Sequence, residues 1–342
     1  METVKTRVVK EGVTSFLVPE TGSWSNRGPG TKIGVGFYNP SMEMNRDMSI
    51  LVVQWFVDTM KKPLKILDGL AASGARGVRI ANEVEGNLEK INETVDRAGE
   101  IDLAIFPELF LTGYHLKDMV FKLAMIPNED PYLEKLKKIA EEKDVKIVVG
   151  FPERSSSGYL YNSLIAIQAS GEEFIYRKRH LPTFSVFDEC RWFKPHSGSL
   201  KIWKLNNIGV GFGICYDTFF PEIFRAYSLM GAKILIIISA SPDFSVPLFE
   251  KLCQTRALEN TCFLFWVNQV GNYDGVGFGG GSMAVSPLGE IIVKCSRLRE
   301  DSRIVEIDLD EVEQVRYSRP LLRDVKREDA EQLLEAYLNR EP

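Results

Sequence analysis

The sequence predicts an α/β fold in which sheets pack face to face beneath layers of helices. Short apolar runs such as "AKILIIISA" predict buried strands, and they alternate with segments whose apolar residues recur at helical spacing. Several predicted strands follow one another with no helix between them, which favours sheets packed on each other under helical layers. A chain of 342 residues is long enough for one large domain, or for a large and a small one.

Composition narrows the class of protein. Apolar residues make up 44% and charged residues 26% of the chain, as in an ordinary soluble globular protein. The net charge of −5 gives no general attraction to nucleic acid. No apolar run reaches the roughly 18 residues of a membrane span, and the N-terminus shows no secretory signal. The five cysteines are scattered and form no CxxC pair, so we expect a reduced, cytoplasmic protein.

The first 63 residues are loop-rich, with Gly, Ser, Pro and Asn clustered over residues 19–40, and residues 47–60 predict an amphipathic or buried helix. One helix has a clear start, because Asp130 is a typical N-cap and Pro131 suits the first helical position. Predicted helices cover residues 87–100, 128–144, 219–231 and 326–338, and predicted strands cover residues 63–70, 101–109, 145–153, 160–168, 207–217, 232–239, 262–271, 281–287 and 303–310.

A glycine turn in "ILDGLAASGARGVRIANEVEG" has the shape of a nucleotide pocket. An apolar strand ends at Asp68, a turn of small residues contains Gly74, and a helix-like segment follows. Backbone N–H groups in such a turn can face a ligand. The simpler explanation is that glycine lets a strand and a helix pack closely, so the turn alone does not establish a cofactor site.

Cys215 is the strongest candidate nucleophile. It ends the predicted strand "GFGICYD", directly before a predicted helix that begins at "FFPE". A cysteine at such a junction can point its sulfur out of the sheet, while neighbouring backbone N–H groups form an oxyanion hole. A buried structural cysteine is the alternative. The other four cysteines lack this strand-to-helix junction.

A cysteine nucleophile needs a base and a group that stabilises charge. The chain offers three histidines, His115, His180 and His196, and the basic run "YRKRHLP" disfavours a charged imidazole at His180. A carboxylate is the other option, because Glu108 follows a buried strand and partial burial makes a carboxylate a stronger base. Lys178 is either a surface cation or part of the site, and spacing leaves both open.

Four motifs occur in the order that resembles the nitrilase, or carbon–nitrogen hydrolase, superfamily: "AIFPELFLTGY", "YRKRHLP", "GICYDTFFPE" and "RALEN". The resemblance runs from about residue 87 to residue 323, about two-thirds of the chain. It implies a four-layer α-β-β-α sandwich and a triad of Glu108 as general base, Lys178 as support for the tetrahedral intermediate, and Cys215 as nucleophile. "FDECRWF" resembles the segment with the family's second active-site glutamate, here Glu189.

The implied reaction is hydrolysis of a small amide through a cysteine thioester. Cys215 attacks the carbonyl carbon, Lys178 and the backbone N–H of Tyr216 stabilise the oxyanion, and ammonia or an amine leaves. "CYDTFFPE" looks more like the amidase branches of the family than like true nitrilases. The resemblance implies no metal ion and no cofactor, a small-molecule substrate as partner, and a homo-oligomer, since the family commonly forms dimers.

A second resemblance concerns the N-terminal 85 residues. "FYNPSMEMNRDMS" and "LDGLAASGARGVRIANE" are similar to the start of the tRNA guanine dimethyltransferases, which use S-adenosylmethionine. This similarity implies that Arg46 and Asp47 lie near the methyl donor and that Asp68 and Gly74 line its pocket. That family's second acidic strand and catalytic Asp-Pro motif are not found in context. The segment therefore looks like part of a cofactor site, and tRNA is a partner only if this segment is active.

The sequence thus divides into a methyltransferase-like fragment at 1–85, a carbon–nitrogen hydrolase domain at 86–323 and a C-terminal helix and tail at 324–342, with the junction near "NEVEGNLEK". Hydrolase family members open with an apolar strand that is absent here, and residues 65–70 are a candidate to take its place. Two other functions stay open beside the hydrolase. One is a methyltransferase function or remnant in the N-terminal fragment, and the other is a non-catalytic binding module.

Overall fold

The computed structural model of the chain describes residues 6–11, 14–19, 75–114, 116, 120–273 and 276–340. For residues 6–11, 14–19 and 75–83 only the backbone is described. The predicted helix at 47–60 and the predicted strand at 63–70, which contains the candidate replacement strand at 65–70, lie outside the described residues.

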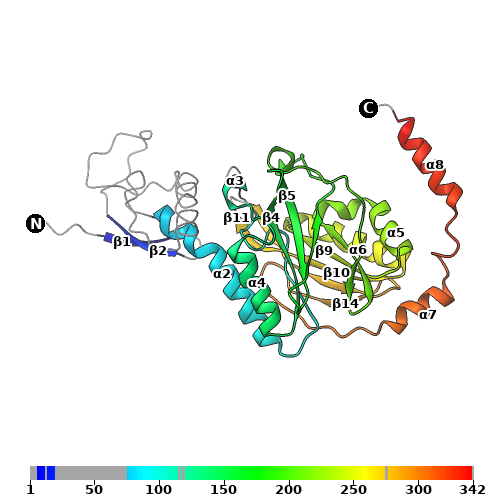
Figure 1. Ribbon diagram of the computed structural model, residues 1–342, viewed down its shortest axis with the longest axis horizontal. Coiled ribbons are helices and arrows are strands. Elements are labelled where there is room, and N and C mark those ends of the chain that lie inside the picture. The colour runs from blue at the N-terminus through cyan, green and yellow to red at the C-terminus, as the bar shows by residue number, and fades with distance from the viewer. Residues whose placement is uncertain are drawn as a thin grey trace, which may run out of the picture.

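Two sheets pack face to face between two helical layers, as the sequence predicts (Figure 1). Helices α2 (Ala75–Ala98) and α4 (Pro131–Glu142) cover one sheet, and helices α5 (Pro221–Leu229) and α6 (Val246–Asn260) cover the other. The predicted four-layer α-β-β-α architecture is therefore confirmed. The structure also describes the short helix α3 (Val120–Leu123), helix α7 (Asp310–Ser318) and helix α8 (Arg327–Leu338).

The first sheet has four described strands in the order β3 (Leu103–Ile105), β4 (Lys146–Arg154), β5 (Leu160–Ile167) and β6 (Glu173–Arg177). Strand β3 runs parallel to β4, and the other neighbours are antiparallel. Because β3 ends the order among the described strands, Glu108, just beyond it, lies at one edge of this sheet.

The second sheet has six described strands in the order β14 (Ile291–Lys294), β13 (Met283–Val285), β10 (Phe263–Asn268), β9 (Ala232–Ser239), β8 (Ile208–Ile214) and β7 (Trp203–Leu205). Its centre, β8–β9–β10, is parallel, and the outer strands pair antiparallel. Two hairpins lie outside these sheets: β1 (Thr6–Glu11) with β2 (Thr14–Pro19), and β11 (Val270–Tyr273) with β12 (Val276–Gly279).

Alternation along the strands of the first sheet explains why it is covered on both faces. On β4, Ile147 and Val149 pack into the core beneath α2 and α4, whereas Val148 packs into the core shared with the second sheet. On β5, Ile165 joins the first core and Leu164 the second. Successive side chains point to opposite faces of a strand, so apolar residues at every position require two apolar neighbours.

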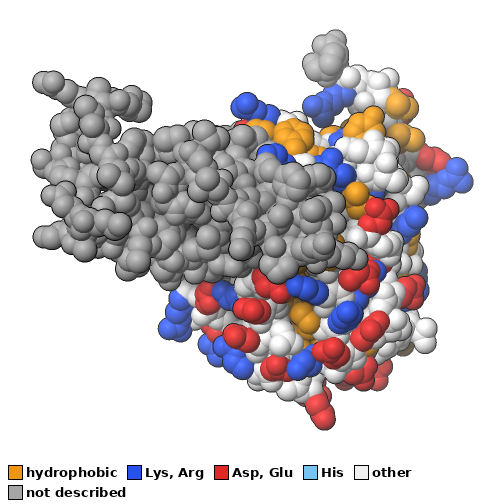
Figure 2. Space-filling view, turned by 60° about the vertical axis from the view of Figure 1, so that its left-hand side comes forward, with side chains coloured by type: hydrophobic (Ala, Val, Ile, Leu, Met, Phe, Trp, Pro, Cys, Tyr) orange, Lys and Arg blue, Asp and Glu red, His pale blue; other side chains and the backbone are white. Residues whose placement is uncertain are grey.

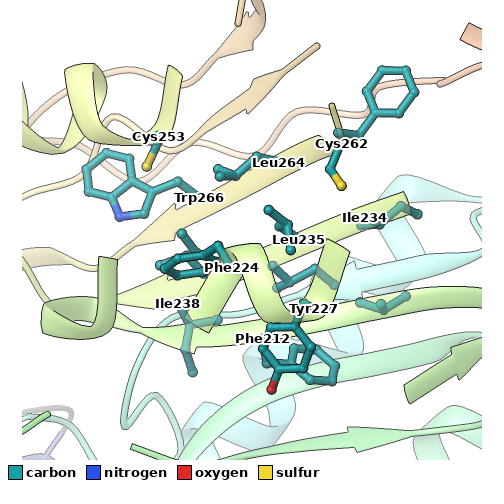
Figure 3. Close-up of a cluster of buried hydrophobic side chains, with 14 of the residues drawn as sticks. Phe212, Phe224, Tyr227, Ile234, Leu235, Ile238, Cys253, Cys262, Leu264 and Trp266 are labelled. Carbon is teal, nitrogen blue, oxygen red and sulfur yellow. The ribbon is translucent and has the colours of Figure 1, made fainter. Parts of the chain in front are cut away.

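The second sheet is buried against α5 and α6 (Figure 3). Phe224 and Tyr227 of α5 are fully buried over the strands, and Trp266 stacks on Phe249 with ring centroids 5.4 Å apart. Burying one such side chain stabilises the fold by roughly 1.5–3 kcal/mol. Cys253 and Cys262 lie in this core, and burial raises the pKa of both thiols, which fits structural cysteines.

Helix α4 begins where the sequence predicts. Asp130 has extended backbone angles, and its side chain accepts a hydrogen bond of 2.9 Å from the N–H of Tyr132. Pro131 takes the first helical position, where a missing N–H costs nothing. The N-cap prediction is confirmed.

One local prediction was wrong. Residues 303–310 form no strand, because their backbone pairs with none of the described strands; Ile307 and Leu309 pack against the core and Ile304 is exposed. The β1–β2 hairpin, which lies within the loop-rich N-terminal stretch, was not predicted. Alternation of apolar residues in 303–310 resembles a strand but supplies no partner for its N–H and C=O groups.

Helix α2 runs without a break through the predicted junction near residue 86. Its buried residues Val84, Leu88, Ile91 and Val95 are spaced by four, three and four positions, so one face of the helix packs into the core. The division of the chain into domains remains a prediction.

Charges on the described surface are mixed. Acidic and basic side chains are interspersed on the face shown in Figure 2. Helices α2 and α4 are joined by exposed ion pairs, such as Lys135 with Glu85 at 2.7 Å. In the described part of the chain, no helix combines the length and apolar character that crossing a membrane requires.

Two glycines at α2 provide a test of the helix across the junction. Gly86 lies in the helix interior, and a Cβ added there would meet open space, so Gly86→Ala should raise the free energy of unfolding by about 0.5–1 kcal/mol. Gly99, just after the helix, has a φ of +73°, which a residue with a side chain adopts at a cost even where the space is open. Gly99→Ala should therefore lower the free energy of unfolding by about 1 kcal/mol. Urea unfolding followed by circular dichroism measures both. A destabilising Gly86→Ala would contradict a continuous helix.

Candidate active site

Four predicted site residues converge at one end of the two sheets. Glu108 follows β3, Lys178 follows β6, Glu189 begins a short 3-10 helix, η3 (Glu189–Arg191), and Cys215 begins another, η4 (Cys215–Phe219), directly after β8. All four are buried, with exposed fractions of 0, 1, 4 and 5% respectively. The structure thus brings together residues that are up to 107 positions apart in the sequence (215 − 108 = 107).

Lys178 stands between the two glutamates. Its Nζ donates to Glu108 Oε1 at 2.7 Å and to Glu189 Oε1 at 2.8 Å. The side chains of Lys178 and Glu108 are completely inaccessible to solvent, and that of Glu189 nearly so. Lys178 is therefore not a surface cation, which the sequence had left open.

The electrostatics of this group favour a charged lysine. Burial by itself lowers the pKa of Lys178, but the charges of Glu108 and Glu189 outweigh it and hold that pKa well above its ordinary value. Burial raises the pKa of Glu189, Lys178 opposes this, and the charge of Glu108 adds to it. Two carboxyl groups share one cation, so Glu189 takes up a proton more readily than an ordinary glutamate does.

Glu108 is held by donors on both of its oxygens. Besides Lys178, Oε1 accepts from Asn162 Nδ2 at 2.7 Å, and Oε2 accepts from the backbone N–H of Ala240 at 2.7 Å. These three donors compensate the charge of a carboxylate that is fully rather than partially buried. They also fix its orientation.

A glycine on β4 allows the Glu108 turn to come this close. A Cβ built on Gly150 would lie 2.3 Å from the backbone N of Leu109 and 2.7 Å from the Cα of Glu108. The Gly150 N–H also donates to the carbonyl of Pro107 at 3.1 Å. A side chain at this position would displace the backbone that carries Glu108.

Cys215 occupies the strand-to-helix junction that the sequence predicts. Its φ of +45° places it in the left-handed region, which a residue with a side chain adopts only where its surroundings impose it. Its Sγ lies 3.6 Å from the hydroxyl of Ser241. Burial and the charge of Glu108 raise the pKa of the thiol to about 12, and Lys178 only partly offsets them. The thiol is therefore protonated at neutral pH and needs a base.

Tyr216 follows Cys215 in η4, and its ring contacts other aromatic residues. It lies edge-on to Phe184 and Phe220 with ring centroids 5.3 Å from each. Its backbone N–H remains the predicted oxyanion donor.

The two described histidines interact with residues other than Cys215. His180 Nδ1 lies 3.0 Å from Asp217 Oδ1, and its ring stacks on Phe220. His196 packs edge-on to Tyr161, and burial lowers its pKa. His115 lies outside the described residues. The charged groups nearest Cys215 are instead Glu108, Lys178 and Glu189, which favours a carboxylate over a histidine as base.

Sequence reasoning assigned no role to three further side chains of this site. Tyr114 donates its hydroxyl to Glu189 Oε1 at 2.6 Å, Asn162 donates to Glu108, and Ser241 approaches Cys215. Asn162 could have been noticed from the sequence, because its polar amide lies in the mainly apolar run "LYNSLIAI", which forms a strand that is buried throughout. Ser241 left no such signal, since it meets Cys215 only through the packing of β8 beside β9.

Aromatic side chains extend from the site towards the surface. Tyr114 lies edge-on to Phe187, Phe187 to Phe184, and Phe184 to Tyr216, with ring centroids 6.3, 6.1 and 5.3 Å apart. Phe184 is half exposed. This series connects the partner of Glu189 to the neighbour of Cys215, so an apolar surface borders the catalytic group.

The predicted methyl-donor residues Arg46, Asp47, Asp68 and Gly74 lie outside the described residues. Among the residues that are described, no group of three or more His, Cys, Asp or Glu side chains is arranged to hold a metal ion.

Two family models match the chain. The carbon–nitrogen hydrolase model matches residues 70–317, and the N2,N2-dimethylguanosine tRNA methyltransferase model matches residues 29–101. The two matches overlap over residues 70–101, which include all of α2. The methyltransferase match covers a minor part of the chain.

Curated relatives match the same region. A glutamine-dependent NAD(+) synthetase from Aquifex aeolicus is 34% identical over 239 residues, 68% of this chain but only 41% of that protein. An (R)-stereoselective amidase from Pseudomonas is 34% identical over 241 residues, 70% of this chain and 85% of that protein. A solved carbon–nitrogen hydrolase from Helicobacter pylori superposes with a TM-score of 0.69 at 25% identity, covering 76% of this chain and 95% of that chain.

The protonated thiol can be tested by alkylation. With a pKa of about 12, the thiolate fraction of Cys215 should rise about tenfold per pH unit between pH 7 and pH 9. The rate of its reaction with iodoacetamide, followed by mass spectrometry of the Cys215 peptide, should rise in proportion, without a plateau. Cys190, which is exposed, is the internal comparison. A rate at Cys215 that does not change with pH would indicate a preformed thiolate paired with Lys178.

Proposed function

Because the chain belongs to the carbon–nitrogen hydrolase family, we propose that it hydrolyses a small amide through a cysteine thioester, with release of ammonia or an amine. The observation that carries the proposal is the buried group of Glu108, Lys178 and Glu189 beside a protonated Cys215. Amide hydrolysis needs a nucleophile, a base and a fixed positive charge, and this group contains all three.

In the first step the thioester forms. Cys215 Sγ bonds to the carbonyl carbon while its proton passes to Glu108, and the carbonyl π electrons move to the oxygen. Lys178, together with the backbone N–H of Tyr216, stabilises the resulting oxyanion. The oxyanion then collapses, the carbon–nitrogen bond breaks, and Glu108 returns the proton to the leaving nitrogen.

In the second step water replaces the sulfur. Glu108 takes a proton from water as its oxygen bonds to the thioester carbon, and the second oxyanion is stabilised as the first one was. Its collapse breaks the carbon–sulfur bond, and Cys215 regains the proton. The acid product leaves and Glu108 is again a carboxylate.

Glu189 keeps the lysine in place. With Lys178 bound to Glu108 and Glu189 at once, its ammonium group cannot turn away from the site. Tyr114 donates to Glu189, and burial, followed by the charge of Glu189, raises the pKa of Tyr114, so it remains a neutral donor.

An amide is proposed rather than a nitrile for two reasons. The nucleophile motif "CYDTFFPE" resembles the amidase branches, and the amidase from Pseudomonas is 34% identical to the matched part of the chain, compared with 31% for a nitrilase from Pyrococcus abyssi. The aromatic side chains at Phe184 and Phe187 suit an apolar acyl group, so the substrate panel should pair aryl and alkyl amides with glutamine, a carbamoyl compound and a nitrile.

The first experiment measures ammonia release from that panel. Wild-type protein should release ammonia from at least one amide, Cys215→Ala should abolish release, and Glu108→Gln should lower it about 10²–10⁴-fold, as loss of a general base does. Cys190→Ala is the matched control, because this cysteine is exposed and its loss should leave the rate unchanged. Release that survives Cys215→Ala would overturn the mechanism.

The methyltransferase match at residues 29–101 carries a second candidate function, binding of S-adenosylmethionine by the N-terminal segment. Since only part of that family's motif set occurs here, we expect titration calorimetry to show no saturable binding. Saturable heat that is lost in Asp68→Asn and kept in Cys215→Ala would support this second function. It would also show that tRNA should be tested as a partner.

A further inference from the structure

We propose that Asp217 is a positioning residue that holds the turn of the nucleophile against the turn of the catalytic lysine. Asp217 lies two residues after Cys215 in η4, is completely buried, and takes no part in the reaction steps above. The proposal rests on the proposed function only for its kinetic test.

One oxygen of Asp217 is bound to the nucleophile turn and to the opposite sheet. Oδ2 accepts from the backbone N–H of Ile214 at 3.1 Å and from the hydroxyl of Tyr176 at 2.8 Å. Ile214 ends β8 directly before Cys215, whereas Tyr176 belongs to β6. This oxygen therefore joins the six-stranded sheet to the four-stranded sheet.

The other oxygen is bound to the turn that follows Lys178. Oδ1 accepts from the backbone N–H groups of Arg179 at 3.3 Å and His180 at 2.9 Å, and lies 3.0 Å from His180 Nδ1. The ring of His180 stacks on Phe220, at the end of η4, with centroids 3.5 Å apart and planes within 9°. The lysine turn and the nucleophile turn are thus connected twice.

These contacts fix the backbone next to both catalytic residues, Cys215 and Lys178. The residue before Cys215 and the two residues after Lys178 are bound to one carboxylate, so the distance between the two catalytic residues depends on it. Charge-assisted hydrogen bonds are roughly twice as strong as neutral ones, and every donor here faces the same buried group. A catalytic group misplaced by 1 Å can cost about 10²-fold in rate.

The left-handed backbone of Cys215 gives an independent reason for the clamp. A residue with a side chain costs about 1–3 kcal/mol in such a conformation, and it persists only where neighbouring contacts determine it. The bond from Ile214 to Asp217 closes the turn around Cys215. Burial, and then the charge of Asp217, raise the pKa of Tyr176, so its hydroxyl stays a donor.

The kinetic test compares Asp217→Asn and Tyr176→Phe with a matched control. Asp217→Asn should lower kcat for the best amide about 10²-fold, and Tyr176→Phe should lower it about tenfold. KM should stay within about threefold of the wild-type value, because the catalytic groups are displaced while the binding of the substrate is unchanged. Tyr227→Phe removes the hydroxyl of another buried tyrosine and should leave kcat unchanged. Rates are expressed per mole of folded protein. If the variants contain less folded protein but that protein has the wild-type kcat, the role of Asp217 is purely structural and the proposal is overturned.

A second measurement does not depend on turnover. Hydrogen exchange followed by NMR should show faster exchange of the Ile214, Arg179 and His180 amides in Asp217→Asn than in wild type. The Lys178 amide, which donates to the carbonyl of Asn162 at 2.8 Å, should be unaffected. Wild-type protein that cleaves no amide would overturn the proposed function while this measurement still tests the clamp. Unchanged exchange at all three amides would overturn the clamp.

Discussion

The site depends on one buried cation shared by two carboxylates. Lys178 lies between Glu108 and Glu189, and the side chains of all three are almost completely inaccessible to solvent. Removing one partner of a buried ion pair typically costs about 3–5 kcal/mol, since an uncompensated charge is left inside. The arrangement is therefore stable only when all members are present and correctly placed. Burial, and then the charge of Glu108, raise the pKa of the neighbouring Cys215 thiol, so the carboxylate that serves as its base also helps to keep it protonated before the reaction.

The rest of the fold supplies what this group requires. Gly150 lets the Glu108 turn approach β4, and the Ala240 N–H and Asn162 complete the hydrogen bonds of the Glu108 carboxylate. A parallel strand order brings β8 and β9 side by side, which places Ser241 next to Cys215. On the far side of the nucleophile, Asp217 connects the same two sheets. Glu108, Lys178 and Cys215 thus each follow a strand, whereas Glu189 begins a short 3-10 helix, so strand packing sets the positions of three of the four residues.

Helix α2 connects the two resemblances of this chain. Both family models include it, and its buried face packs into the core beneath the four-stranded sheet. A helix needs only an apolar stripe at the correct spacing to fill this position. This tolerance explains how a segment that resembles one family can continue into the first helical layer of another without a break in the backbone.

The sequence by itself determined the architecture, the start of α4 at Asp130, and the identity of Glu108, Lys178, Glu189 and Cys215 as candidates. These depend on local periodicity, on capping chemistry and on motifs of contiguous residues, all of which involve residues that are close together in the sequence. Only the tertiary structure decided that Lys178 is buried, that His180 faces Asp217 rather than Cys215, and that residues 303–310 form no strand. Burial and strand pairing depend on residues that are distant in the sequence, so no local pattern could contain them.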